Sequence, residues 1–244
     1  MPIARSPQGS PTLSLFAWSG AIVFAGSLLW FLYCYAVRFG VAAPEGPILR
    51  PLLIDIGLFS AFALHHSVLA RSAVKAAIGR RLGPGLERSL YTWIASLLFI
   101  AVCSFWQPVP GRLYVLGGGW ALLGYALQCA GLILTLRGAS AVDLLDLAGV
   151  RPVRLAAGGS APTHVPLATS GLYGFVRHPL YFAWVLLVFG APSMTATRAT
   201  FAIVSTIYLA AAIPWEERSL VDTFGPDYEA YRRKVRWRMI PGVY

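Results

Sequence analysis

The sequence predicts an all-α membrane protein, a bundle of about six transmembrane helices with a cytoplasmic helical tail at its C-terminal end. Apolar residues make up 57% of the 244 positions and charged residues only 12%, and the mean hydropathy is +0.64. These values are too apolar for a soluble domain. Long uncharged segments also recur along the chain, and a helix needs about 20 such residues to cross the roughly 30 Å hydrocarbon layer.

Six segments reach or approach this length. The first, residues 13–37, has no charge and is too long for the apolar core of a typical secretory signal peptide, so we expect a retained span. The others are residues 51–70, 89–111, 113–136, 179–197 and 199–215, of which the last is marginal in length. The whole chain, residues 1–244, is expected to form one integral membrane domain that begins with a four-span bundle over residues 1–136.

The basic residues predict the orientation in the membrane. The chain has 20 Lys and Arg residues against 10 Asp and Glu residues, a net charge of +10. With six spans, most of these cations fall on one side, and the other side holds only Arg38, Arg50, Arg112 and Arg198. Positive charge collects on the cytoplasmic side, so both termini are expected there, in a bacterial inner membrane. The partners indicated by this pattern are membrane lipids, and we expect no nucleic acid partner.

A stripe of small residues marks the fourth span. Gly117, Gly124, Gly131 and Gly138 recur at intervals of seven, and in lipid such residues let two helix backbones approach closely. We expect this helix to pack tightly against a neighbour, with Gln128 adding one interhelical hydrogen bond. The alternative is that the stripe only reflects the abundance of glycine in transmembrane helices.

Charged residues gather next to the last two predicted spans. They are Arg177 and His178, which end a long cytoplasmic loop over residues 137–178, and Glu216 and Glu217, which follow the sixth span. Because a turn of only a few residues joins the two spans, both groups are expected at the same end of a hairpin. Pro179 suits the first turn of a helix, where its missing N–H costs nothing. The charges form either a structural ion pair or, since a lock needs only one carboxylate, a site for a polar ligand or a cation.

These residues and the tail that follows them resemble one family. The sequence RHPLY (Arg177–Tyr181), the adjacent Glu pair and the tail sequence FGPDYEAY (Phe224–Tyr231) are similar, over residues 167–235, to the isoprenylcysteine carboxyl methyltransferase and phospholipid methyltransferase superfamily. The resemblance implies a membrane-embedded methyltransferase that binds S-adenosylmethionine without a Rossmann domain, and the chain has no glycine-rich βαβ fingerprint. By the same resemblance, the cofactor-binding residues are Tyr173, Arg177, His178, Pro179, Tyr181, Glu216 and Glu217.

The resemblance is incomplete at two places. Ala183 stands where family members often have glycine, and Val235-Arg236 stands where they often have a Val-Pro pair. The register of the tail is therefore open, and the basic residue that faces the substrate is Arg232 or Arg233, with Arg233 as our candidate catalytic residue. We expect the hairpin and tail together, residues 179–244, to form the cofactor site.

A second resemblance concerns the N-terminal half. Residues 64–71 (LHHSVLAR) and 87–89 (ERS) are similar to a bacterial branch that contains methanethiol S-methyltransferases and NnrU-like proteins. This implies a small thiol as the methyl acceptor. His66 is a second candidate catalytic residue, which would take the thiol proton because imidazole titrates near neutral pH. The alternative for His66 is a hydrogen-bonded histidine between two helices.

Other interpretations stay open. His65 and His66 are adjacent on a helix and point about 100° apart, and the three cysteines have no metal-ligand spacing, so we expect no metal site. The acceptor is alternatively a prenyl-cysteine carboxylate or a phospholipid amine. In a different class of function, the chain is a nonenzymatic, NnrU-like membrane component. The sequence indicates no oligomeric state.

Overall fold

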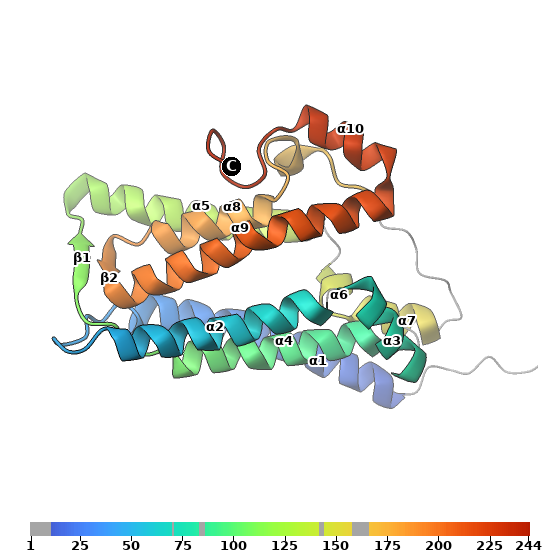
Figure 1. Cartoon of the computed structure of the whole chain (residues 1–244), viewed down its shortest axis with the longest axis horizontal. Helices are drawn as coiled ribbons and strands as arrows, with labels where there is room; N and C mark the ends of the chain where they lie inside the picture. The colour runs from blue at the N-terminus through green and yellow to red at the C-terminus, as the bar shows by residue number, and fades with distance from the viewer. Residues whose placement is uncertain (1–10, 70, 83–85, 142–143, 158–165) are drawn as a thin grey trace, which may run out of the picture. The chain divides into compact units, whose positions relative to one another are not determined.

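Five long helices have the length and composition of membrane spans (Figure 1). The structure, a computed structural model, describes residues 11–69, 71–82, 86–141, 144–157 and 166–244. Within these residues the five helices are α1 (Pro11–Tyr33) with its π-helical extension (Cys34–Arg38), α2 (Leu49–Leu69), α4 (Leu86–Phe105), α5 (Gly118–Ala141) and α9 (Ala196–Phe224). The chain is therefore an integral membrane protein.

The helices observed at the last two predicted spans differ in length from those predicted. The helix predicted over residues 179–197 ends early, because α8 (Pro179–Phe189) is followed by Gly190 and Pro192. Its 11 residues cover only about half of the hydrocarbon layer. In contrast, α9 has 29 residues and is about 43 Å long, so one end of it extends past the apolar layer. The count of six spans stays a prediction.

Two short strands, which the all-α prediction did not include, connect these helices. β1 (Arg112–Val115) pairs antiparallel with β2 (Ser193–Thr195), with Tyr114 opposite Met194. β1 lies where the prediction ends the third span and begins the fourth, because two prolines follow Phe105 and prevent the helix from continuing. The fold is otherwise a bundle of helices, so the predicted class is confirmed at this coarse level.

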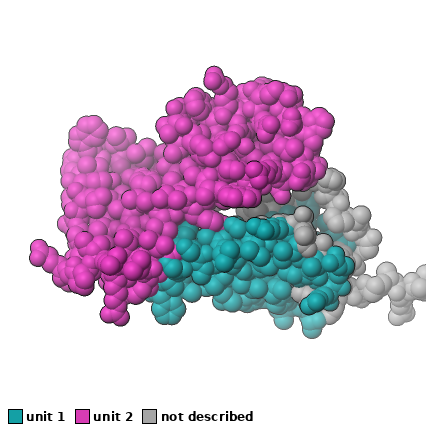
Figure 2. All heavy atoms as spheres, in the orientation of Figure 1, with its two compact units in different colours: residues 1–34, 57–106, 143–165 teal, residues 35–56, 107–142, 166–244 magenta. Residues whose placement is uncertain are grey.

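The chain divides into two compact units (Figure 2). Unit 1 comprises residues 1–34, 57–106 and 143–165, and unit 2 comprises residues 35–56, 107–142 and 166–244. The predicted division at residues 136 and 178 concerns the arrangement in the membrane and stays a prediction. Unit 2 contains both motifs of the predicted cofactor site.

Unit 1 is built on the packing of α1 against α4. Trp93 of α4 donates its indole N–H to the carbonyl oxygen of Phe16 at 3.0 Å. Gly20 makes room for this ring, since a Cβ on Gly20 would lie 2.8 Å from Trp93 Cδ1. α7 (Val150–Ala157) also packs on α1 through a small buried apolar cluster. The unit also includes α3 (Ser72–Leu82) and α6 (Leu144–Leu147).

The glycine stripe of α5 packs against α8 in unit 2. An added Cβ would be closer than 3 Å to this neighbouring segment at Gly124, Gly131 and Gly138. At Gly131 the obstacle is backbone, the carbonyl oxygen of Ala183 at 2.6 Å. Gln128 adds an interhelical hydrogen bond from Nε2 to the carbonyl oxygen of Leu187 at 3.1 Å. The predicted close packing and the predicted hydrogen bond are both present.

The chain after α9 folds back as a short helix, α10 (Pro226–Lys234). Gly225 makes the turn with φ 53°, a conformation that favours glycine, and its N–H donates to the carbonyl oxygen of Val221 at 2.8 Å. Tyr228 and Tyr231 of α10 are buried in an apolar cluster with residues of α9 and of the 3₁₀ turn η2 (Gly171–Gly174). The tail is thus a packed helix, and its cytoplasmic location stays a prediction.

Candidate active site

The entrance to α8 brings Arg177 and His178 next to the tail. Pro179 is the first residue of α8, as the sequence predicts, and His178 is its N-cap. The backbone N–H groups of Arg177 and His178 donate to the carbonyl oxygens of Trp237 (2.9 Å) and Arg238 (2.8 Å). The tail beyond α10 therefore lies alongside the entrance to the helix.

Arg177 and Glu217 form a buried ion pair between this entrance and α9. Arg177 Nε lies 2.6 Å from Glu217 Oε1, and the two residues are 9% and 5% exposed. Nη1 of Arg177 also donates to the carbonyl oxygens of Val235 (2.6 Å) and Arg236 (3.0 Å). Buried charges are tolerated when they have such partners. The two predicted groups of charges do meet, and Arg177 links α9 to the tail.

Glu216 is in a different environment from Glu217. The Glu216 side chain is 44% exposed, against 6% for Glu217. Tyr181 Oη donates to Glu216 Oε2 at 2.7 Å, and His178 Nδ1 lies 3.6 Å from the same oxygen. The rings of His178 and Tyr181 are stacked, with centroids 5.3 Å apart. Glu217 therefore forms a buried ion pair, whereas Glu216 is accessible beside two aromatic rings.

A polar cavity of about 330 Å³ lies beside Glu217. Its walls come from the C-terminal half of α9, from α10 and from the tail. The lining residues are Pro214, Glu217, Arg218, Val221, Asp222, Glu229, Arg232 and Arg238. Three carboxylate and three guanidinium side chains therefore face one space, which suits a ligand that carries both a negative and a positive group.

Tyr244 holds Arg238 in position at this cavity. Arg238 Nη1 donates to Tyr244 Oη at 3.0 Å, and the guanidinium carbon lies 5.1 Å from the centre of the Tyr244 ring. The backbone N–H groups of Arg238, Met239 and Ile240 all donate to the carbonyl oxygen of Tyr244. Arg238 Nε also lies 3.7 Å from Glu217 Oε2. The loop over residues 238–244 thus sets the direction of a guanidinium group that lines the cavity.

Three tyrosines near the Glu pair, Tyr173, Tyr228 and Tyr231, have raised pKa values and are neutral at physiological pH. Burial raises the pKa of Tyr231 to about 12, and its Oη donates to the carbonyl oxygen of Tyr173 at 2.6 Å. Burial raises the pKa of Tyr228 and of Tyr173, with smaller contributions from Glu217 and Glu216 respectively. Tyr228 is 1% exposed, and its Oη has no hydrogen-bond partner among the described residues.

Comparison with known proteins identifies the family. Residues 152–222, which include α8 and the Glu pair, match the isoprenylcysteine carboxyl methyltransferase (ICMT) family. The chain is 36% identical to the methanethiol S-methyltransferase of Crocosphaera subtropica over 192 aligned residues. These residues cover 77% of this chain and 74% of that protein. This chain is 32% identical over 224 residues to the methanethiol S-methyltransferase of Mycobacterium tuberculosis, covering 91% and 88%. The chain belongs to the isoprenylcysteine carboxyl methyltransferase family.

This family member is a membrane methyltransferase. It is also similar to Nurim of Sus scrofa, at 30% identity over 190 residues that cover 73% of this chain and 71% of Nurim. No solved structure matches the chain. The family resemblance read from the RHPLY sequence and the Glu pair is confirmed.

The two predicted catalytic residues belong to different units, Arg233 to α10 of unit 2 and His66 to α2 of unit 1. The Arg233 side chain is 71% exposed and lies 3.7 Å from Glu229, while its neighbour Arg232 lines the cavity. His66 belongs to unit 1, where Tyr91 Oη is 2.6 Å from its Nδ1. This bond between α2 and α4 agrees with the alternative of a histidine bonded between helices. The catalytic roles of Arg233 and His66 stay predictions.

The residues that line the cavity include four charged ones that were not among the predicted site residues, namely Arg218, Asp222, Glu229 and Arg238. Arg218 and Asp222 are four residues apart on α9 and therefore share a helix face, so a helical projection that continues past the Glu pair finds them. Arg238 has no comparable signal in the sequence. Its position depends on the loop that brings Tyr244 against it, which only tertiary contacts establish.

Proposed function

We propose that this family member transfers a methyl group from S-adenosylmethionine to a small thiol at the cavity beside Glu217. The observation that carries the proposal is the division of the Glu pair, with Glu217 closed into an ion pair and Glu216 accessible beside two aromatic rings. A purely structural lock needs no second, accessible carboxylate. Relatives named methanethiol S-methyltransferase, of which the chain covers 74% and 88%, support the thiol.

The side chains that line the cavity fit the polar groups of this cofactor. S-adenosylmethionine carries a carboxylate, an ammonium group and ribose hydroxyls. The guanidinium groups of Arg218, Arg232 and Arg238 suit the carboxylate, and the carboxylates of Asp222 and Glu229 suit the ammonium group or the ribose. Arg238 is the best prepared of the three arginines, because Tyr244 already orients it.

Arg177 has a different part in this proposal from the one predicted. Its Nε and Nη1 are engaged by Glu217 and by carbonyl oxygens of the tail. Arg177 therefore shapes the cavity by holding the tail against α9. Direct contact of Arg177 with the cofactor carboxylate stays a prediction.

The residues next to Glu216 suit a positively charged sulfur. When bound, the cofactor would supply a methyl group on a sulfonium. A thiolate would take this methyl group as the sulfonium S–CH3 bond breaks, with the neutral thioether S-adenosylhomocysteine as the leaving group. Glu216 contributes a negative charge, and His178 and Tyr181 contribute stacked ring faces that attract a cation. The protein then contributes mainly alignment of the reacting groups. A thiolate is a strong nucleophile, so a small thiol needs no elaborate general base.

The proposal includes a cytoplasmic site in a bacterial inner membrane, with both termini on the same side. It is supported by the density of basic residues on α10 and the tail, namely Arg232, Arg233, Lys234, Arg236 and Arg238. A reporter enzyme that is active only outside the cytoplasm, fused after Tyr244, should be inactive. Activity of that reporter contradicts this orientation.

Binding of S-adenosylmethionine to detergent-purified protein tests the cofactor site. Calorimetry should show saturable binding to the wild type and binding weaker by about tenfold in Glu216→Gln, which is the loss of one charged hydrogen-bonding group. Glu45→Gln is the matched control, because Glu45 is an exposed acid of the same unit and is not the carboxylate that contacts Tyr181 and His178. Equal binding by Glu216→Gln contradicts the role of Glu216, and no binding by folded wild type contradicts the cofactor.

Methyl transfer to three acceptors then tests the substrate. We expect labelled methyl groups to reach methanethiol, but not a prenyl-cysteine or phosphatidylethanolamine. Transfer only to the prenyl-cysteine or the lipid retains the methyltransferase and replaces its acceptor. Cofactor binding without transfer to any of the three favours a membrane component that is not an enzyme.

A further inference from the structure

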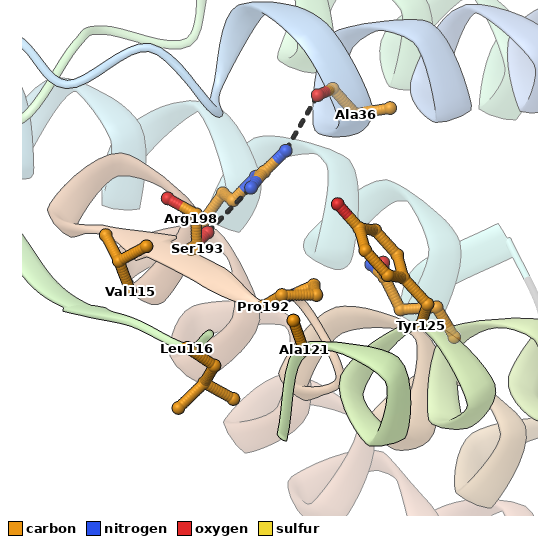
Figure 3. A pocket seen from close by; sticks show the side chains of 9 residues that line it. Ala36, Val115, Leu116, Ala121, Tyr125, Pro192, Ser193 and Arg198 are labelled. Atoms are coloured by element: carbon orange, nitrogen blue, oxygen red, sulfur yellow. Dashed lines mark hydrogen bonds between the residues drawn. The ribbon is translucent and has the colours of Figure 1, made fainter. Parts of the chain in front are cut away.

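A second pocket of unit 2 has a volume of about 240 Å³ (Figure 3). It shares no lining residue with the cavity beside Glu217. Arg198, in the first turn of α9, lines this second pocket, and Glu217 is 19 residues further along this helix, about 28 Å away. The lining residues are Ala36, Val115, Leu116, Ala121, Tyr125, Gln128, Pro192, Ser193 and Arg198. The proposed methyl transfer uses none of them.

Arg198 is a buried cation whose partners are all uncharged. It is 8% exposed. Its Nε donates to Tyr35 O (2.9 Å), its Nη1 to Ser193 O (2.6 Å) and its Nη2 to Ala36 O (2.7 Å), and Figure 3 shows the last two bonds. The Tyr35 ring lies 5.4 Å from the guanidinium carbon. No carboxylate of the described residues pairs with Arg198, so its positive charge is not neutralised within this part of the chain.

The backbone around Arg198 is shaped to admit the guanidinium. Tyr35 and Ala36 belong to the π-helical extension of α1, and their carbonyl oxygens turn to Arg198. A Cβ on Gly40 would lie 2.5 Å from Arg198 Nη2, so glycine leaves the space that this group fills. The guanidinium has more N–H groups than these three hydrogen bonds use, and it lines the pocket.

The rest of the lining supplies further donors and an apolar wall. Tyr125, Gln128 and Ser193 carry O–H or N–H groups, and in Figure 3 the hydroxyl of Tyr125 is turned toward the side of the pocket where Arg198 lies. None of the lining residues is an aspartate or a glutamate. A water molecule needs about 10–15 Å³ of such space, so the pocket has room for a polyatomic group. Its chemistry, a cation with neutral donors, is that of an anion receptor.

We propose that this pocket binds a phosphate-type oxyanion against the guanidinium of Arg198. Two sources have this chemistry, the headgroup of an anionic lipid and a free phosphate. The position favours the lipid, because the pocket lies where two spanning helices begin, at Gly118 of α5 and Ala196 of α9, and lipid phosphates lie at the ends of such spans. The apolar wall, with Val115 and Leu116, suits the glycerol and upper acyl part of a lipid.

Filling the pocket tests the proposal without removing Arg198, whose loss would leave three carbonyl groups without a donor. Ala121→Phe adds an aromatic ring to a residue that lines the pocket together with Arg198, and we expect this ring to fill part of the pocket. Leu122→Phe is the matched control, because Leu122 is on the same helix, 71% exposed and outside the lining. Tyr125→Phe removes one neutral donor and keeps the shape. The unfolding temperature of each variant without ligand shows whether it folds.

The probes are inorganic phosphate at constant ionic strength, short-chain phosphatidylglycerol, and the uncharged short-chain diacylglycerol. The measurement is the rise of the unfolding temperature of the detergent-purified chain, from which an apparent Kd follows. We expect phosphatidylglycerol to stabilise the wild type and Leu122→Phe alike, with an apparent Kd about tenfold weaker in Ala121→Phe and about threefold weaker in Tyr125→Phe.

The outcomes separate the sources. Stabilisation by phosphatidylglycerol alone supports the lipid headgroup, and stabilisation by inorganic phosphate as well supports an oxyanion site that needs no acyl chain. Equal stabilisation by diacylglycerol overturns the proposal, because it shows that charge is not recognised. Equal Kd values for the wild type and Ala121→Phe, or no stabilisation of the wild type by either phosphate compound, also overturn it. Arg198 is then only a structural bridge.

Discussion

Arg177 and Arg198 are both buried in unit 2, 9% and 8% exposed, yet their charges are balanced in different ways. Arg177 has the carboxylate of Glu217 at 2.6 Å as well as two carbonyl groups. Arg198 has three carbonyl groups and a tyrosine ring. A guanidinium that is already neutralised fixes the structure around it, and in the proposed function the neighbouring accessible Glu216 is the carboxylate that faces the ligand. A guanidinium without a carboxylate still attracts an anion.

The largest effect is expected from removing the Glu217 carboxylate, because this charge distinguishes the surroundings of Arg177 from those of Arg198. Glu217→Gln leaves Arg177 as a buried cation held only by carbonyl groups, and we expect the free energy of unfolding to fall by about 3–5 kcal/mol. Chemical unfolding of the purified protein measures this change. Glu216→Gln is the control and should cost less than about 1 kcal/mol, since Glu216 is exposed. If Glu217→Gln is as stable as the wild type, carbonyl groups alone suffice at both arginines and the comparison fails.

The next effect concerns α8, which lies between the two arginine sites in the sequence. Gly131→Ala places a Cβ against the backbone of α8, 2.6 Å from Ala183 O, and we expect a loss of about 1–3 kcal/mol of stability. Gly117→Ala is the matched control, because a Cβ on Gly117 meets nothing within 4 Å. Thermal unfolding compares the two variants. Equal stability would show that α5 and α8 are not closely packed.

A smaller effect is expected for a tyrosine beside the proposed cofactor cavity and not for a tyrosine near Arg198. Tyr244→Phe removes the hydroxyl that orients Arg238, and we expect the KM for S-adenosylmethionine to rise about fivefold, the effect of roughly 1 kcal/mol, with kcat unchanged. Tyr114→Phe, in β1 at the Arg198 end, should leave this KM as it is. A fall in kcat with no change in KM would place Tyr244 in another role than positioning Arg238.

The smallest effect is confined to high pH. The pKa of Tyr231 is about 12 in the folded protein, against an ordinary value of 10. The phenol is neutral in both states below pH 10, so it causes no pH dependence there. Between pH 10 and about 12 the unfolded chain loses this proton first, and stability falls as pH rises. Unfolding temperatures across this range should decline less in Tyr231→Phe, and an identical decline would contradict the assignment.

The meeting of Arg177 and His178 with the Glu pair was largely predictable from the sequence. The RHPLY sequence and the Glu pair flank two apolar helices joined by a short connection, so their charges have to meet at one end of the hairpin. The glycine stripe predicted the packing of α5, because only small residues allow such close backbones. The unequal exposure of Glu216 and Glu217 was not predictable, since adjacent residues on a helix differ only through what packs against each of them.

The Arg198 end was mostly not predictable. The sequence places Arg198 in a connection between two spans, where a basic residue is expected to be solvated. In the structure it is buried, because the π-helical extension of α1, more than 160 positions away in the sequence, supplies two carbonyl oxygens in addition to that of the nearby Ser193. The pairing of β1 with β2 likewise depends on residues about 80 positions apart, which no local pattern relates.

The sequence by itself determined the membrane-helical class, the family and the residues that meet at the Glu pair, because apolar length, small-residue spacing and motifs are local properties of the chain. Only the tertiary structure decided that Glu217 and not Glu216 is buried in an ion pair, how Tyr244 orients Arg238 and why Arg198 lies in a pocket. These features depend on how distant backbone groups compensate a buried charge, and that balance exists only once the chain is packed.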